Sequence, residues 1–250
     1  MRKLNLFFVI SLMLYSCGGG SDSVVDEVVE DNTSETVKKT DLSGTWCYYS
    51  GELQSLLSKE AKDIYNVILE LSPSGNLKEH VITYAEYVSS KEYDAYGNWT
   101  TANDRLTITN WVGDTIVSEV PFLLVENESL SLKLDGRDVV FLSQDLIKSR
   151  YSQLIIGNWI SAVRENGMTK TVFEKIGEGY EHSEYASSIG TLYNKENFVW
   201  SINKDTLTIH PDWIVGPTGD LKHTINFINQ KHFSITELSR GKTTKYYTRE

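Results

Sequence analysis

Two adjacent Glu-His pairs are the residues of this sequence whose types and spacing could carry out chemistry. They are Glu79-His80 and Glu181-His182. A carboxylate beside an imidazole could form an acid–base pair or supply two metal ligands. Adjacent residues on a strand point to opposite faces, however, so neither pair can converge on one atom without a bulge. We therefore expect both pairs to lie on a solvated strand face.

The sequence carries none of the common catalytic or cofactor motifs. It has no G-x-S-x-G elbow, no H-E-x-x-H motif, no Walker loop and no C-x-x-C pair. The other histidines, His210, His223 and His232, have no ligand spacing. We therefore predict no catalytic residue, no metal site and no cofactor. A hydrolase would require the Glu-His pairs to meet a nucleophile in one pocket.

An internal repeat in the sequence indicates the domains whose strands position these residues. WTTANDRLTI at 99–108 is repeated as WSINKDTLTI at 200–209, and Gly44-Thr45-Trp46 is repeated as Gly157-Asn158-Trp159. A period near one hundred residues is that of a whole domain. We predict two copies of one domain, residues 41–145 and 146–250, with a short helical insertion at 52–62 in the first copy.

Each copy is predicted to be an antiparallel meander of about eight strands. Short alternating runs are separated by turn signals such as Asp135-Gly136, and the fold is all-β, closing into an up-and-down barrel or a sandwich. The repeated segment is then a hairpin, with Trp99 and Trp200 as apolar anchors near a strand end. The predicted strands are 44–50, 64–71, 77–88, 96–101, 105–110, 115–125, 129–134 and 137–142, then 156–163, 169–176, 179–187, 191–202, 206–210, 221–228, 232–238 and 243–248.

The first sixteen residues are typical of a signal peptide. A positive start, Met1-Arg2-Lys3, precedes an apolar run that is too short to span a bilayer. The run ends Leu14-Tyr15-Ser16-Cys17, which resembles the lipobox of bacterial lipoproteins. That resemblance implies lipidation of Cys17, with acyl groups such as palmitate, and cleavage before it. An ordinary signal peptide with an incidental cysteine is the alternative.

Residues 17–40 are predicted to be a flexible acidic tether. Gly18-Gly19-Gly20-Ser21 is followed by several Asp and Glu residues, a composition that stays solvated. Gly18 stands where a common inner-membrane retention signal has Asp. We therefore expect an outer-membrane lipoprotein of a Gram-negative cell, in the periplasmic or the surface leaflet. Cys47 then has no partner for a disulfide and is expected to be a strand residue rather than a reactive thiol.

Charge excludes one class of partner. The formal net charge is −10 and the longest basic runs are pairs such as Lys38-Lys39. Nucleic-acid binding needs a basic face, so nucleic acid is excluded as a partner. The lipid bilayer, reached through acylated Cys17, is the expected partner.

The Gly-x-Trp motif that opens each copy resembles that of the lipocalins. With the aromatic strand and the Leu-Thr-Ile hairpin, the layout over residues 41–250 is similar to the lipocalin-like domains of bacterial surface lipoproteins. The resemblance implies small β-barrels anchored by Gly44, Trp46, Gly157 and Trp159 that bind an apolar or amphipathic molecule. It also implies a late-strand arginine stacked on the first tryptophan, for which Arg137 and Arg240 are the candidates.

Aromatic residues are the remaining clue to a ligand. Exposed rings stack on sugars or pack against lipid, whereas buried rings form core, and the core interpretation is favoured for most of them. Trp111 and Trp213 follow the repeated hairpin at matched positions, so we expect them at the mouths of the barrels. With Tyr84 and Tyr185 they are the candidate ligand-binding residues.

Two functions follow from these observations. The first is a non-catalytic, membrane-anchored lipoprotein whose barrels bind a small hydrophobic or amphipathic ligand. The second is an interaction or scaffold lipoprotein with filled barrels, which binds a protein or a glycan by its outer surface.

Overall fold

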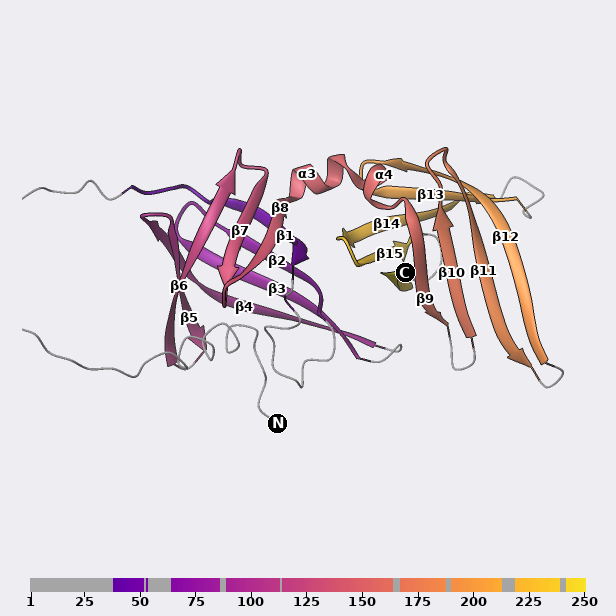
Figure 1. The fold of residues 1–250 in the computed structure, drawn as a ribbon, viewed down its shortest axis with the longest axis horizontal. Coiled ribbons are helices and arrows are strands. Elements are labelled where there is room, and N and C mark those ends of the chain that lie inside the picture. The colour runs from indigo at the N-terminus through magenta and orange to yellow at the C-terminus, as the bar shows by residue number, and fades with distance from the viewer. Residues whose placement is uncertain are drawn as a thin grey trace, which may run out of the picture.

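The chain forms two closed antiparallel barrels in tandem, joined by two short helices (Figure 1). The structure is a computed structural model that describes residues 38–51, 53, 64–85, 89–112, 114–163, 167–187, 190–212, 219–238 and 242–250. In each barrel every strand pairs with its neighbours in the chain, and the last strand closes on the first. This topology confirms the all-β fold with up-and-down barrels.

The first barrel, barrel 1, is closed by the antiparallel pairing of its first and eighth strands, in which Trp46 lies opposite Ser143. Its strands are β1 Gly44–Gly51, β2 Ile64–Leu71, β3 Asn76–Ala85, β4 Ser89–Ala102, β5 Arg105–Val112, β6 Asp114–Val125, β7 Ser129–Leu134 and β8 Arg137–Ser143.

The second barrel, barrel 2, is closed in the same way, with Arg249 opposite Trp159. Its strands are β9 Gly157–Val163, β10 Gly167–Phe173, β11 Glu178–Ser187, β12 Gly190–Asn203, β13 Thr206–Pro211, β14 Leu221–Ile228, β15 His232–Glu237 and β16 Thr244–Arg249.

The predicted strands are found in both barrels, with one clear difference in extent. Strand β4 begins at Ser89 rather than near residue 96, because its first half pairs residue by residue with β3, up to Ala85 opposite Ser89. Leu53 is the one described residue of the predicted helical insertion, and it is helical and buried. The rest of that insertion lies outside the described residues.

The helices between the barrels, α3 Gln144–Ser149 and α4 Tyr151–Leu154, were not predicted. They have six and four residues, too few to produce a clear helical period. Ser143, the last residue of β8, caps α3: its hydroxyl accepts a hydrogen bond from the Leu146 amide at 3.4 Å.

The repeated segment is the β4–β5 hairpin in barrel 1 and the β12–β13 hairpin in barrel 2, as predicted. Each tryptophan of the repeat is hydrogen-bonded to a glycine in an earlier turn, the turn before β3 in barrel 1 and the turn before β11 in barrel 2. The Trp99 amide donates to the Gly75 carbonyl at 2.8 Å, and the Trp200 amide donates to the Gly177 carbonyl at 2.7 Å. Both glycines have positive φ, +83° and +79°, which explains why glycine recurs at this point.

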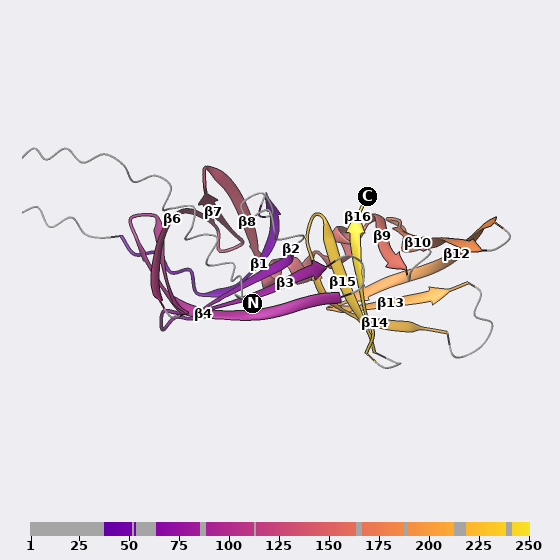
Figure 2. The same ribbon diagram turned by 90° about the horizontal axis from the view of Figure 1, so that it is seen from below.

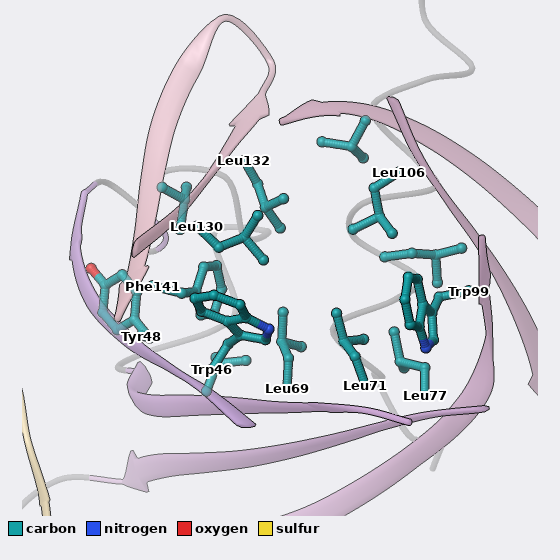
Figure 3. Close-up of a cluster of buried hydrophobic side chains, with 14 of the residues drawn as sticks. Trp46, Tyr48, Leu69, Leu71, Leu77, Trp99, Leu106, Leu130, Leu132 and Phe141 are labelled. Carbon is teal, nitrogen blue, oxygen red and sulfur yellow. The ribbon is translucent and has the colours of Figure 1, made fainter. Parts of the chain in front are cut away.

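Alternate residues of each strand in barrel 1 form a common apolar core (Figure 3). Trp46 and Trp99 point into this interior from different strands, and both are less than a tenth exposed. Trp46 also donates from Nε1 to the Leu42 carbonyl at 2.8 Å. The core includes side chains from all eight strands, so barrel 1 is packed with its own residues along much of its length.

The outward face of β1 and β8 in barrel 1 packs against the linker helices. Cys47 and Leu142 belong to one buried cluster with Ile147 of α3 and Tyr151 of α4, and this cluster continues into the core of barrel 2. Cys47 lies on a strand, and burial raises its pKa to about 11, so the thiol stays protonated at neutral pH. Both findings agree with the expectation of a strand residue.

The two barrels also touch directly, where β15 lies beside β2 (Figure 2). Ile82 of β3 packs with Phe227 of β14, and both side chains are buried. The backbone amide of Gln230 donates a hydrogen bond to the backbone carbonyl of Tyr49 at 3.1 Å. The barrels are therefore joined at two apolar clusters, one at the linker helices and one between Ile82 and Phe227.

Candidate functional site

The two members of each Glu-His pair lie on opposite sides of their barrel wall. Glu79 lies between Leu77 and Val81, which share its face of β3 and belong to the core of barrel 1. His80 faces outward, and its Nδ1 lies 2.7 Å from Oδ1 of Asp94 on β4. The carboxyl and the imidazole therefore do not converge on one atom.

The prediction of a solvated strand face is wrong for Glu79, which is 2% exposed. Closure of the sheet into a barrel encloses the face of β3 that carries this carboxyl. Its Oε2 atom makes no hydrogen bond to the described residues. Burial raises the pKa of Glu79 to about 8, so the carboxyl is mostly protonated at neutral pH.

Glu181 occupies the same place in barrel 2 but has polar neighbours. It is half-buried, and it lies opposite Thr171 on β10 and opposite Glu196 on β12. Burial raises the pKa of Glu181, the charge of Lys245 opposes this shift, and that of Glu196 adds to it. Its neighbour His182 faces outward, with Nε2 at 3.7 Å from Oε1 of Glu184 and its ring stacked on Tyr193.

The interior of barrel 2 is lined in part by polar side chains, of which Thr171 lies directly opposite Trp159. Four hydroxyl side chains share the inward face of β9, β10 and β11, and all are buried: Ser161, Thr169, Thr171 and Ser183. Thr169 and Ser183 face each other with their oxygens 3.2 Å apart. On β12, the exposed side-chain amide of Asn194 donates to Oε1 of the half-buried Glu196 at 2.7 Å.

His223 brings a third kind of polar group into this interior. It lies two residues before the core residue Ile225 on β14, it is 5% exposed, and it pairs with Glu237 of β15. Its Nδ1 atom makes no hydrogen bond to the described residues. Burial lowers the pKa of His223, and the charge of Lys245 lowers it further, so the imidazole is neutral at pH 7.

The end of barrel 2 next to the linker is closed by Trp159 and Arg249. The Arg249 guanidinium lies 4.3 Å from the centre of the Trp159 ring, and its Nη2 donates to the Leu154 carbonyl at 2.7 Å. Trp159 is fully buried and donates from Nε1 to the Ile155 carbonyl at 2.7 Å. This geometry seals the end of the barrel next to the linker.

Arg249 therefore has the role for which Arg137 and Arg240 were the candidates. Arg240 lies outside the described residues, and Arg137 is exposed at the start of β8, opposite Leu134. In barrel 1 the residue opposite Trp46 is Ser143, which caps α3 instead. The sequence signal for Arg249 is its alternation with the buried Tyr247 on the last strand.

The four aromatic residues predicted to bind ligand cannot be assigned to either interior. Tyr84, Trp111 and Tyr185 lie on β3, β5 and β11, but their side chains lie outside the described part of the structure. Trp213 lies outside the described residues, as does Cys17. The polar interior of barrel 2 was not predicted, although Thr169 and Thr171 lie two residues apart on β10 and Ser183 lies opposite Thr169.

In comparisons with known proteins, no family model matches the chain and no curated protein matches it. The fold defines the class of protein: two tandem eight-stranded meander barrels of the lipocalin-like type. Within the described residues, no three His, Cys, Asp or Glu side chains are arranged to hold a metal ion. None of the described helices is long and apolar enough to cross a membrane.

Proposed function

We propose that this protein is a non-catalytic, membrane-anchored lipoprotein that binds a small hydrophobic or amphipathic molecule within its lipocalin-like barrels. The observation that carries the proposal is a buried polar atom inside barrel 2, Nδ1 of His223, which makes no hydrogen bond to the described residues. Such an atom destabilises a fold by about 1–3 kcal/mol, and a bound ligand can supply the missing hydrogen bond.

The proposed anchor is supported by the sequence of the first seventeen residues. The positive start, the short apolar run and Cys17 after Leu14-Tyr15-Ser16 fit lipidation. Two or three acyl chains would hold the protein stably on a membrane. The acidic tether and Gly18 favour the outer membrane.

Native mass spectrometry of a chain that begins near residue 34 tests the binding proposal, since that chain keeps every described residue. We expect an additional mass under native conditions that disappears after organic extraction. A single unliganded mass, also after incubation with fatty acids and glycans, would contradict ligand binding. The formula of the retained molecule would give its chemical class.

The anchor is tested separately by expressing the full chain and its Cys17→Ser variant in a Gram-negative host with labelled palmitate. We expect label and outer-membrane fractionation for the unchanged chain, and neither for the variant. Equal label in both proteins would show that Cys17 is not the lipidated residue.

The packing of barrel 1 supports the second candidate function, a scaffold that works through its outer surface. Its core is filled by its own side chains, and Leu123 and Val125, 63% and 47% exposed, lie on one face of β6. Barrel 2 has buried polar groups where barrel 1 has apolar ones, so we favour ligand binding for the molecule as a whole.

A further inference from the structure

The two barrels can be compared position by position because their strand registers match. Trp46 lies opposite Leu69, and Trp159 lies opposite Thr171, so Leu69 and Thr171 are equivalent. In the same way Glu79 and Glu181 are equivalent, since Glu79 lies opposite Leu69 and Glu181 lies opposite Thr171. The comparison shows which interior positions the two copies share.

The walls formed by the first three strands of each barrel differ in polarity. Apolar or aromatic side chains of barrel 1 are replaced by small hydroxyl side chains in barrel 2, and both sets are buried. The equivalent pairs are Tyr48 and Ser161, Val67 and Thr169, Leu69 and Thr171, and Val81 and Ser183. Three of the four replacements also shorten the side chain.

The opposite walls differ in the same direction, with ionisable groups in barrel 2. The equivalent pairs are Ala95 and Glu196, Val120 and His223, Leu134 and Glu237, and Val139 and Lys245. Eight inward-facing positions are thus apolar or aromatic in barrel 1 and polar in barrel 2, where Glu196 and Glu237 are half-buried and Lys245 is exposed. The apolar anchors Trp46 and Trp159, by contrast, are shared, so the difference is confined to one part of the interior.

These polar groups of barrel 2 face one common space. Lys245 of β16 acts on the pKa of Glu181 on β11 and on that of His223 on β14. Glu181 in turn acts on the pKa of Tyr247 on β16. β16 is hydrogen-bonded to neither β11 nor β14, and Tyr247, two residues after Lys245, belongs to the core of barrel 2, so Lys245 lies on the inward face of β16.

Acceptor groups outnumber cations in this space. Glu181, Glu196 and Glu237 share the inward face with the exposed Lys245, whereas Arg249 is engaged by Trp159. His223 is buried, and its Nδ1 makes no hydrogen bond to the described residues. Carboxylates accept hydrogen bonds, and hydroxyl side chains can donate or accept them. A ligand that offers ammonium and hydroxyl donors would match this lining, and an anionic fatty acid would not.

We propose that barrel 2 is the binding barrel, that its ligand is a small molecule carrying an amino group and hydroxyl groups, and that barrel 1 is its apolar structural counterpart. The proposal rests on the proposed ligand-binding function and names the barrel and the chemistry. Glu181 and the hydroxyls of β10 and β11 contact the ligand. Glu79, at the equivalent position in barrel 1, does not.

The test is calorimetric titration of the full-length chain in detergent with three probes: glucosamine, glucose and dodecanoate. We expect glucosamine to bind most tightly, glucose more weakly because it lacks the amine, and dodecanoate not to bind barrel 2. The variant Glu181→Gln should weaken glucosamine binding by about tenfold or more, since a hydrogen bond to a charged group is lost. The double variant Thr171→Leu, Ser183→Val installs the barrel 1 residues and should weaken it similarly.

Glu79→Gln is the matched control, and it should change glucosamine affinity by less than about twofold, because distant sites act independently. Thermal unfolding of each variant shows whether it is folded. Absence of glucosamine binding, or equal affinity in Glu181→Gln, overturns this inference. If dodecanoate binds and its affinity is unchanged in Glu181→Gln, the proposed function stands and this inference is overturned. If none of the three probes binds and the native mass is unliganded, both are overturned.

Discussion

Glu79 and His80 are neighbours in the chain but lie in opposite environments. The carboxyl is enclosed by the core of barrel 1, whereas the imidazole pairs with Asp94 on the outside. Neither position is chosen by the chemistry of the glutamate or histidine side chain. Strand alternation alone puts one residue on each side of the wall, and barrel closure makes one side an interior.

The buried carboxyl of Glu79 makes folding depend on pH in a specific direction. Its pKa rises from 4.5 to about 8 on folding, so the folded protein is weakened as pH increases through this range. We expect the free energy of unfolding to fall on the order of 3–5 kcal/mol between about pH 5 and about pH 9. The variant Glu79→Leu should lose most of this fall, as measured by urea unfolding at both pH values.

Glu181→Leu is the control for that experiment, because Glu181 is half-buried and has Lys245 nearby. Its effect on the pH dependence should be smaller than that of Glu79→Leu. An unchanged pH dependence in Glu79→Leu would show that the carboxyl is not buried as described.

The Arg249 side chain connects its own strand, β16, to β9 and to the linker helix α4. It stacks on Trp159 and donates to the carbonyl of Leu154 in α4. We expect Arg249→Ala to lower the free energy of unfolding by about 1–3 kcal/mol, and Arg249→Lys to recover less than half, since lysine lacks the planar group. Urea unfolding measures both, and exposed Arg137→Ala should change stability by less than about 0.5 kcal/mol.

At the scale of elements, the same pair of strands is packed in two complementary ways. In barrel 1, Leu77 of β3 lies opposite Gly97 of β4, whereas in barrel 2 Gly179 of β11 lies opposite Phe198 of β12. The bulky side chain of the pair comes from β3 in barrel 1 and from β12 in barrel 2. The two barrels thus keep a common strand order while their interiors are packed by different side chains.

This packing predicts a strong effect of a single methyl group at Gly179. A Cβ there would lie 2.4 Å from both the Phe198 ring and the Val172 carbonyl oxygen. We expect Gly179→Ala to destabilise barrel 2 by about 2–3 kcal/mol through overpacking. Thermal unfolding would detect the loss, and the neighbouring exposed change Glu178→Ala should have little effect; an unchanged midpoint for Gly179→Ala would contradict the close packing.

At the scale of the whole molecule, the two barrels are coupled through an apolar interface. Ile82 and Phe227 pack across it directly, and Cys47 and Leu142 extend the core of barrel 2 through the linker helices. Barrel 1 therefore contributes to the stability of barrel 2 even where its own interior has a different polarity.

We expect this interface to make the barrels unfold together in one calorimetric transition. The variant Phe227→Ser removes a buried side chain from the interface and should split the transition in two, at a cost of about 2–4 kcal/mol. The exposed variant Leu123→Ser should leave a single transition. Two transitions in the unchanged protein would mean that the interface couples the barrels weakly.

The sequence alone determined the tandem repeat, the strand positions and the meander topology. These features depend on local signals: alternation along each strand, and turns such as Asp135-Gly136, where both residues have positive φ. The repeated Trp99 was also recognisable from the sequence, although its hydrogen bond to Gly75 was not.

Only the tertiary structure decided which side of each strand became an interior and what gathered there. Alternation gave Glu79 and His80 opposite faces, but it could not say which face barrel closure would bury. The pairing of Trp159 with Arg249, and the placement of Glu181, His223 and Lys245 in one space, join residues from distant parts of the chain. Such contacts depend on closure of the barrel, which no local pattern specifies.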